Sequence, residues 1–179
     1  WASSANVQLS SVSVSTSGGL GIYTAGVRLG SWSAISSSTI MAWNAHGLWL
    51  SASARTSVSY SSVSSLHPGF SALYLDGASS NTVTGSYISN PAGWSASLSN
   101  ADCNTISQST IASASTGIAL YLVASDSNTV TDSYIANPEG DALRIQSGSD
   151  RNMVGQSSII SNKAGWYALY ITGSDSNTV

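Results

Sequence analysis

Charged side chains are scarce in this sequence, which has 5 Lys and Arg and 8 Asp and Glu among 179 residues. The formal net charge of −3 gives no electrostatic footprint for nucleic acid, so we expect no nucleic-acid partner. The longest apolar stretch, Ile118 to Ala124, is too short to cross a bilayer, so membrane insertion is not expected. The single cysteine, Cys103, excludes an intrachain disulfide and a cysteine-based zinc site, and we expect it to be a buried or half-buried small side chain.

Serine is abundant, with 42 residues, yet the chain is not a low-complexity polar segment. Apolar residues make up 42% of the sequence and include 6 Trp and 8 Tyr. A composition this rich in apolar and aromatic residues favours a folded chain over a disordered one.

A short string, Ser-Asn-Thr-Val, recurs at 80–83, 127–130 and 176–179, with variants at 103–106 and 151–154. Its asparagines lie at positions 81, 104, 128, 152 and 177, so the spacings are 23, 24, 24 and 25 residues. A regular period in this range predicts stacked supersecondary units of one kind.

Each repeat contains three short pieces with the alternation of a β-strand, and none has helical periodicity. In one repeat these pieces are 73–75, 82–84 and 86–88. Three strands per coil, with equivalent strands of successive coils about 4.8 Å apart, predict a parallel β-helix of about seven coils of roughly 24 residues. We expect one all-β domain over 1–179, a fragment of a longer repeat protein.

The alternation also predicts which side chains stack inside the coil. The expected inward ladders are Val83/Ile106/Val130/Val154, Ile88/Ile111/Ile135/Ile159 and Leu75/Leu98/Leu122/Ile145/Ile171, with a serine ladder at Ser38, Ser61, Ser86, Ser109, Ser133 and Ser157. One glycine precedes the third strand of each coil, which indicates a bend with positive φ or a close backbone approach. These glycines are Gly26, Gly47, Gly69, Gly93, Gly117, Gly140 and Gly165. The asparagine amides are expected to satisfy turn backbone groups of the next coil.

The repeat N-T-[VI]-x-x-S-x-I…G-x-x-L-x-[LI], over 34–179, resembles right-handed parallel β-helix proteins of the pectate-lyase-like superfamily. It is most similar to the NosD-type repeats of bacterial surface and periplasmic proteins. The resemblance implies a right-handed coil. It implies no activity, because this fold carries lyases, hydrolases, epimerases, adhesins and inert stalks.

The carboxylates are candidates for catalytic and for metal-binding groups. The best enzyme candidate is the set Asp132, Glu139 and Asp141, which occupies one coil with Arg144 nearby. Four other aspartates repeat at one turn, which favours hydrogen-bonded Asx turns, with calcium held between coils as the alternative. These are Asp102, Asp126, Asp150 and Asp175. His46 and His67 have no visible partner, so we expect them to be loop residues.

Two outward-facing patterns are candidates for contact with a ligand. The first is a stripe of one residue per coil on the third strand: Arg28, Trp49, Tyr74, Ser97, Tyr121, Arg144 and Tyr170. Its aromatic residues could stack on sugar rings or a partner chain, or simply on one another. The second is a Thr-x-Thr array on the first strand, at 82–84, 105–107 and 129–131, which resembles insect ice-binding proteins. Met153 and Gly155 interrupt this array.

Together these features favour a non-catalytic extracellular or cell-surface module, a stalk or adhesin, with a glycan or another copy of the chain, end to end, as partner. The first alternative is a polysaccharide-active lyase or hydrolase domain whose catalytic coils are degenerate or missing. The second is an ice-binding solenoid. No cofactor is expected.

Overall fold

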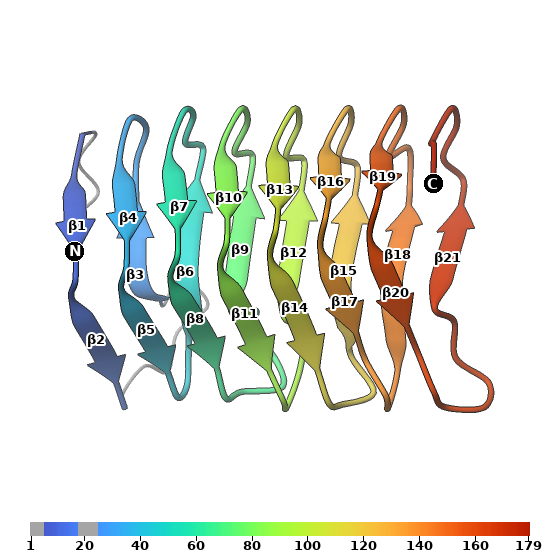
Figure 1. Cartoon of the computed structure of the whole chain (residues 1–179), viewed down its shortest axis with the longest axis horizontal. Coiled ribbons are helices and arrows are strands. Elements are labelled where there is room, and N and C mark those ends of the chain that lie inside the picture. Colours follow the sequence, from blue (N-terminus) through green and yellow to red (C-terminus); the bar gives the residue numbers. More distant parts are fainter. Residues whose placement is uncertain (1–5, 18–24) are drawn as a thin grey trace.

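The computed structural model describes residues 6–17 and 25–179, in which 21 short strands form three parallel sheets that run along a solenoid (Figure 1). Sheet A contains β1 (Gln8–Ser10), β4 (Ala34–Ser36), β7 (Ser57–Ser59), β10 (Thr82–Thr84), β13 (Thr105–Ser107), β16 (Thr129–Thr131) and β19 (Met153–Gly155). Sheet B contains β2 (Ser13–Thr16), β5 (Thr39–Ala42), β8 (Ser62–Ser65), β11 (Tyr87–Asn90), β14 (Thr110–Ser113), β17 (Tyr134–Ala136) and β20 (Ser158–Ile160). Sheet C contains β3 (Ala25–Leu29), β6 (His46–Ser51), β9 (Leu73–Asp76), β12 (Ala96–Ser99), β15 (Ile118–Val123), β18 (Asp141–Gln146) and β21 (Leu169–Thr172).

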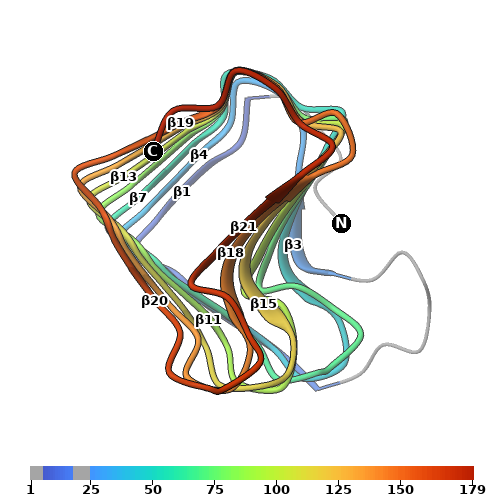
Figure 2. The ribbon, with the colours of Figure 1, turned by 90° about the vertical axis from the view of Figure 1, so that its right-hand side faces the viewer.

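Every strand pairs in parallel with the strand three places away in the chain, so each coil passes through sheets A, B and C in turn. Viewed along the solenoid, the coils overlie one another and the three sheets form three sides around a common interior (Figure 2). The register is the one that the repeat predicts: Val83 lies opposite Ile106, and Ile106 opposite Val130. The predicted β-solenoid is therefore confirmed.

The interior consists of the predicted aliphatic ladders. The ladder that runs from Val83 to Val154 is buried along its whole length. Each fully buried aliphatic side chain contributes roughly 1.5–3 kcal/mol before chain entropy is counted. The last coil departs from the expectation: Ile159 is only half-buried and Ile171 is 38% exposed. No following coil covers these two side chains in the structure.

The corner between sheets A and B explains the serine ladder. Ser86 donates from its hydroxyl to the Thr84 carbonyl (2.9 Å) and accepts the N–H of Ser61 in the preceding coil (3.2 Å). The residue before each of the six serines has a positive φ: Ser37, Tyr60, Gly85, Gln108, Asp132 and Gln156. A small side chain with one hydroxyl therefore satisfies backbone groups of two coils at a tight bend.

The recurring glycines before sheet C are needed for close approach rather than for positive φ. A Cβ at Gly47 would lie 2.6 Å from the Ala72 carbonyl oxygen, a distance that no side chain tolerates. Of the seven, Gly165 alone has a positive φ, 85°. Gly69 shows neither feature, because its nearest neighbour, His67, would lie 3.4 Å from an added Cβ.

The corner between sheets C and A is built on the asparagine ladder, as expected. Asn81 donates its backbone N–H to Oδ1 of Asn104 (2.9 Å), and Nδ2 of Asn104 donates back to the Ala78 carbonyl (2.9 Å). The positive φ falls on the residue before each asparagine, including Cys103 with φ 57°. That backbone turns the Cys103 side chain outward, so the expectation that it is buried or half-buried was wrong: it is exposed.

Candidate functional site: a groove on the outer face of sheet C

The predicted outward stripe exists, with one residue on each strand of sheet C in direct register. Arg28 lies opposite Trp49, Trp49 opposite Tyr74, and the pairing continues through Ser97 to the end of the sheet. The remaining pairs join Ser97 to Tyr121, Tyr121 to Arg144 and Arg144 to Tyr170.

The stripe is not a uniformly exposed row, however, because some of its side chains are buried by their neighbours on sheet C. Trp49 is 3% exposed. His46 lies beside it with ring centroids 5.8 Å apart, and the Arg28 guanidinium lies 4.6 Å from its ring centroid. Trp49 is thus part of the fold and not a contact surface.

His46 is the centre of an aromatic cluster and not an isolated loop residue. Its ring stacks on Tyr74 (4.6 Å between centroids, 19° between planes) and meets the edge of Phe70 at 5.0 Å. Its Nδ1 accepts the N–H of Ser71 (2.9 Å). Burial lowers the pKa of His46 to about 4, so the imidazole is neutral at neutral pH. Burial, and then the neighbouring charge of Asp76, raise the pKa of Tyr74.

Next to this cluster, a groove of about 340 Å³ opens over the one position of the stripe that carries a small side chain. Ser97 forms its floor, and Tyr74 and Tyr121 stand on the strands either side of it. Phe70 and Trp94, from the loops between sheets B and C, form its side wall.

Two hydroxyl groups of the groove have no partner in the described part of the chain. Ser71 and Ser97 are 2% and 3% exposed, and both line the groove. Neither side-chain hydroxyl makes a hydrogen bond there, and neither oxygen is among the buried polar atoms without a partner, so both oxygens are accessible to solvent. These hydroxyls are therefore the free donors and acceptors that a ligand would meet.

The wall at Trp94 is held in place by its neighbours. Its ring packs edge-on against Tyr121 (5.4 Å between centroids, 63° between planes). A Cβ at Gly117 would lie 2.8 Å from Cδ1 of Trp94, so only glycine leaves room for this ring. Tyr121 is fixed in turn, because Nε2 of Gln146 donates to its hydroxyl (2.6 Å). Trp94 nevertheless stays 41% exposed and open to a ligand.

The far end of the stripe has a structural role. Asp141 is fully buried, and its Oδ2 accepts from both Nε and Nη2 of Arg144. Its Oδ1 accepts the N–H of Tyr167 (2.8 Å), and Arg144 lies over the Tyr170 ring at 5.4 Å. The carboxylate of Asp141 and the guanidinium of Arg144 are thus both paired within the protein.

The proposed acidic set is not brought together. Asp132 lies in the turn between β16 and β17, while Glu139 lies in the segment that joins β17 to β18 and Asp141 is the first residue of β18. Glu139 pairs with Lys163 (2.9 Å) at the surface. Within 6–17 and 25–179, no three His, Cys, Asp or Glu side chains are grouped so that they could hold a metal ion.

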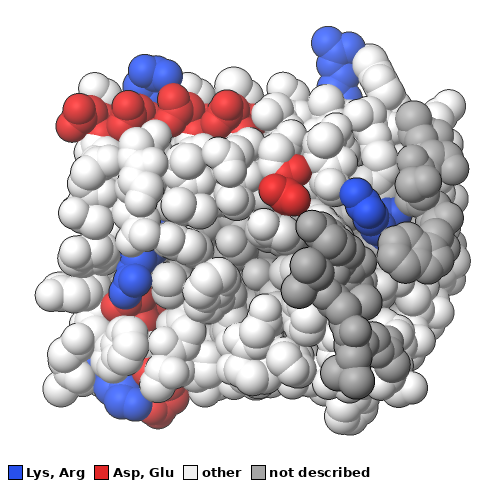
Figure 3. All heavy atoms as spheres, turned by 180° about the vertical axis from the view of Figure 1, so that it is seen from behind, with Lys and Arg blue, Asp and Glu red and all other residues white. Residues whose placement is uncertain are grey.

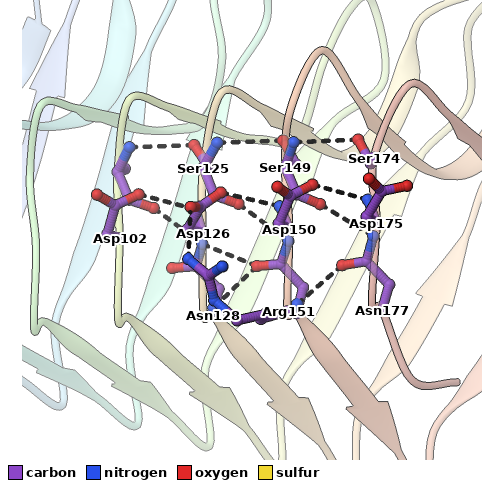
Figure 4. A network of polar contacts seen from close by, with 12 residues as sticks. Asp102, Ser125, Asp126, Asn128, Ser149, Asp150, Arg151, Ser174, Asp175 and Asn177 are labelled. Atoms are coloured by element: carbon purple, nitrogen blue, oxygen red, sulfur yellow. Dashed lines mark hydrogen bonds and ion pairs between the residues drawn. The ribbon is translucent and has the colours of Figure 1, made fainter.

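The four repeated aspartates form a continuous row along one edge of the molecule (Figures 3 and 4). Oδ1 of Asp102 accepts the N–H of Asp126 (2.7 Å), and the same bond recurs from Asp126 to Asp150 and from Asp150 to Asp175. The hydrogen bonds therefore run between coils and not within one turn. Oδ2 of Asp126 also pairs with Arg151 (3.0 Å). Calcium binding by this row stays a prediction.

The Thr-x-Thr array is also in register on the outside of sheet A. Thr82, Thr105 and Thr129 form one row, and Oγ1 of Thr84 lies 3.1 Å from the Ser107 hydroxyl in the other. Met153, 43% exposed, ends the first row.

Residues 20–179 match the family model of the right handed beta helix region. The chain belongs to this right-handed β-helix family. The family match establishes the coil handedness that the resemblance implied. No curated protein and no solved structure is significantly similar to this β-helix chain. No helix long and apolar enough to cross a membrane occurs among the residues that the structure describes.

Sequence reasoning found the stripe of this β-helix protein but missed the wall and the free hydroxyl of Ser71. Phe70 and Trp94 lie in loops that vary in length, so they have no place in the strand pattern. A signal was present: each directly follows one of the recurring glycines, Gly69 and Gly93.

Proposed function

We propose that this chain is a non-catalytic, extracellular or cell-surface β-helix module that binds carbohydrate in the groove on sheet C. The observation that carries the proposal is the groove itself, with aromatic rings around two serine hydroxyls that make no hydrogen bond in the described chain and are accessible to solvent. Ligand sites of this kind combine apolar walls with a few placed polar groups.

The chemistry of the groove matches that of a sugar. A pyranose ring has a C–H face that stacks on aromatic side chains and hydroxyl groups around its edge that form hydrogen bonds. Tyr74, Tyr121 and Trp94 supply the rings, and Ser71 and Ser97 supply the hydroxyls. His46 is neutral at neutral pH, so no cation lines the groove to select an acidic ligand.

Two of the carboxylates considered as catalytic candidates are already held in ion pairs within the protein. This supports a binding role over a hydrolytic one. A glycosidase requires two carboxylates that face one glycosidic bond. Asp141 is buried in an ion pair with Arg144, and Glu139 is paired with Lys163. No Asp or Glu is among the described residues that line the groove.

A glycan array, followed by affinity electrophoresis on the polysaccharides that score, tests the proposal. We expect binding that Tyr74→Ala or Tyr121→Ala weakens at least tenfold, because each removes one stacking surface. Tyr87→Ala and Tyr134→Ala are the controls, since these tyrosines are exposed on the outside of sheet B, and they should bind like the parent. Loss of binding in the controls alone, or release of sugars from a polysaccharide, would contradict the proposal.

The in-register threonine rows on sheet A favour ice binding as a second candidate. Thermal hysteresis of the protein solution tests it. Activity that Thr105→Lys abolishes would support this candidate, and the absence of any hysteresis would exclude it.

End-to-end association of two copies also stays a prediction. Sedimentation equilibrium over a concentration series tests it, with a mass that rises toward the dimer as the expected result and a constant monomer mass as the contrary one.

A further inference from the structure

We infer that the groove takes a single sugar ring at a time, in the place of the side chain that the stripe lacks at position 97. The inference rests on the proposed function and specifies its ligand: a terminal or branching residue of an uncharged glycan.

The two tyrosines that bound the gap are separated by one coil. Neighbouring parallel strands lie about 4.8 Å apart, so Tyr74 on β9 and Tyr121 on β15 are about 9.6 Å apart at the backbone. Carbon atoms in contact are separated by about 3.5–4.0 Å, so a ring between two others needs about 7–8 Å. The gap above Ser97 therefore fits one ring and not two.

The free face of Tyr74 points toward this gap. Its ring has Trp49 (5.8 Å, 32°) and His46 (4.6 Å, 19°) as aromatic neighbours, both from β6, the strand on the opposite side of β9 from Ser97. Tyr74 also lines the groove. The face turned away from β6 is thus the one available to a ligand.

The floor of the gap determines how a ring enters. Ser97 and Ser71 lie at the bottom, with solvent-accessible hydroxyls that make no hydrogen bond among the described residues. A sugar ring that stacks between two tyrosines presents one edge to these hydroxyls and the other edge to solvent. Tyr74 and Tyr121 close the two ends along the solenoid axis, so a glycan chain leaves through the open edge alone. That geometry selects a terminal or branch residue.

The charges nearby favour an uncharged sugar. Asp76 lies on the same strand as Tyr74, in register with Ser99 of the groove, and disfavours a second negative charge there. None of the residues that line the groove is Lys or Arg.

Titrations followed by NMR and by the intrinsic tryptophan fluorescence, to which Trp94 contributes, test the inference. The probes are the methyl pyranosides of glucose, galactose, mannose and N-acetylglucosamine, each compared with its linear oligosaccharides. We expect one of the methyl glycosides to bind with nearly the affinity of its oligosaccharides, because only one ring is enclosed.

Substitutions at position 97 make the test specific. Ser97→Phe, which supplies the missing ring, should abolish binding while the melting temperature stays within a few degrees, and Ser97→Ala should weaken binding up to about tenfold through the lost hydrogen bond. Ser62→Phe, at an outward position of β8 in sheet B, is the matched control and should bind normally.

Three results would overturn the inference, and they differ in what they say of the proposed function. An affinity that grows with each added unit of a linear glycan would show that the chain lies along the solenoid, and carbohydrate binding would stand. Unchanged binding by folded Ser97→Phe would place the sugar elsewhere on the molecule. No binding to any glycan would contradict both proposals.

Discussion

Each asparagine of the ladder joins neighbouring coils through a single residue. Oδ1 of Asn128 accepts the N–H of Asn104 (2.8 Å), and Nδ2 of Asn128 donates to the Ala101 carbonyl (2.9 Å). Asn128 is 1% exposed, so water cannot replace these bonds. A regular hydrogen-bond pattern explains why the same residue type recurs at this corner.

Asn128→Ala should therefore destabilise the protein strongly. The substitution orphans a buried N–H and a buried carbonyl, each at a cost of about 1–3 kcal/mol. Urea unfolding measures the loss. Asn162→Ala, at an exposed position, is the control and should change the free energy of unfolding little. Equal effects of the two substitutions would contradict the role of the ladder.

His46 makes stability depend on pH. Its pKa is lowered from 6.5 to about 4 in the folded state, so between these values the unfolded chain binds the proton and the folded chain does not. Stability should be constant above pH 6.5 on this account and fall as the pH is lowered to 4, by up to about 3 kcal/mol.

The variant His46→Asn isolates this effect, because an amide oxygen can still accept the Ser71 N–H while the titration is removed. Urea unfolding between pH 4 and pH 7 should show a shallower slope for the variant than for the parent. Identical slopes would mean that other groups cause the pH dependence.

At the scale of elements, the loops from sheet B to sheet C decide the shape of the surface. The strands on either side repeat closely, but these loops carry Phe70 and Trp94 over the outer face of sheet C. Gly117 shows how tightly one loop is fitted, since an added Cβ would meet both Trp94 and the Gly93 backbone at under 3 Å.

Gly117→Ala should displace Trp94 and open the wall of the groove. We expect a red-shifted tryptophan emission and a loss of stability on the order of 1–3 kcal/mol from the overpacking. Gly148→Ala is an unsuitable control, because Gly148 has a positive φ. Gly155→Ala is better, because nothing lies within 4 Å of its Cβ position and its φ is not positive. An unchanged emission spectrum for Gly117→Ala would contradict the role of Gly117.

At the scale of the whole molecule, stability is a sum over coils and their nearest neighbours. Leu120 and Leu169 occupy equivalent positions of one ladder, joined through Leu143. Leu120 is fully buried between two coils, whereas Leu169, in the last coil of the structure, is half-buried.

Leu120→Ala should cost about 2–5 kcal/mol, the usual range for a fully buried leucine, and Leu169→Ala clearly less. Chemical denaturation of the 179-residue chain gives both values. A larger loss in the free energy of unfolding for Leu169→Ala would show that the stability of a coil does not depend on contacts with its neighbouring coils alone.

The sequence by itself determined the coil, its three strands and the direction of each strand's side chains. A period of about 24 residues and a period of two within each strand leave one register in which Val83, Ile106 and Val130 stack. The strand pattern is short and recurs in every coil. A coil whose strands are hard to assign can therefore be aligned with the next one. The stripe on sheet C was predictable for the same reason.

Only the tertiary structure decided which part of that stripe is a site. Trp49 and Tyr74 occupy the same phase of the repeat, yet the first is buried and the second borders the groove. Asp141 belongs to the best enzyme candidate in the sequence and is a buried partner of Arg144 in the fold. The difference lies in the side chains that pack around each position, because exposure depends on what covers a strand and not on the strand itself.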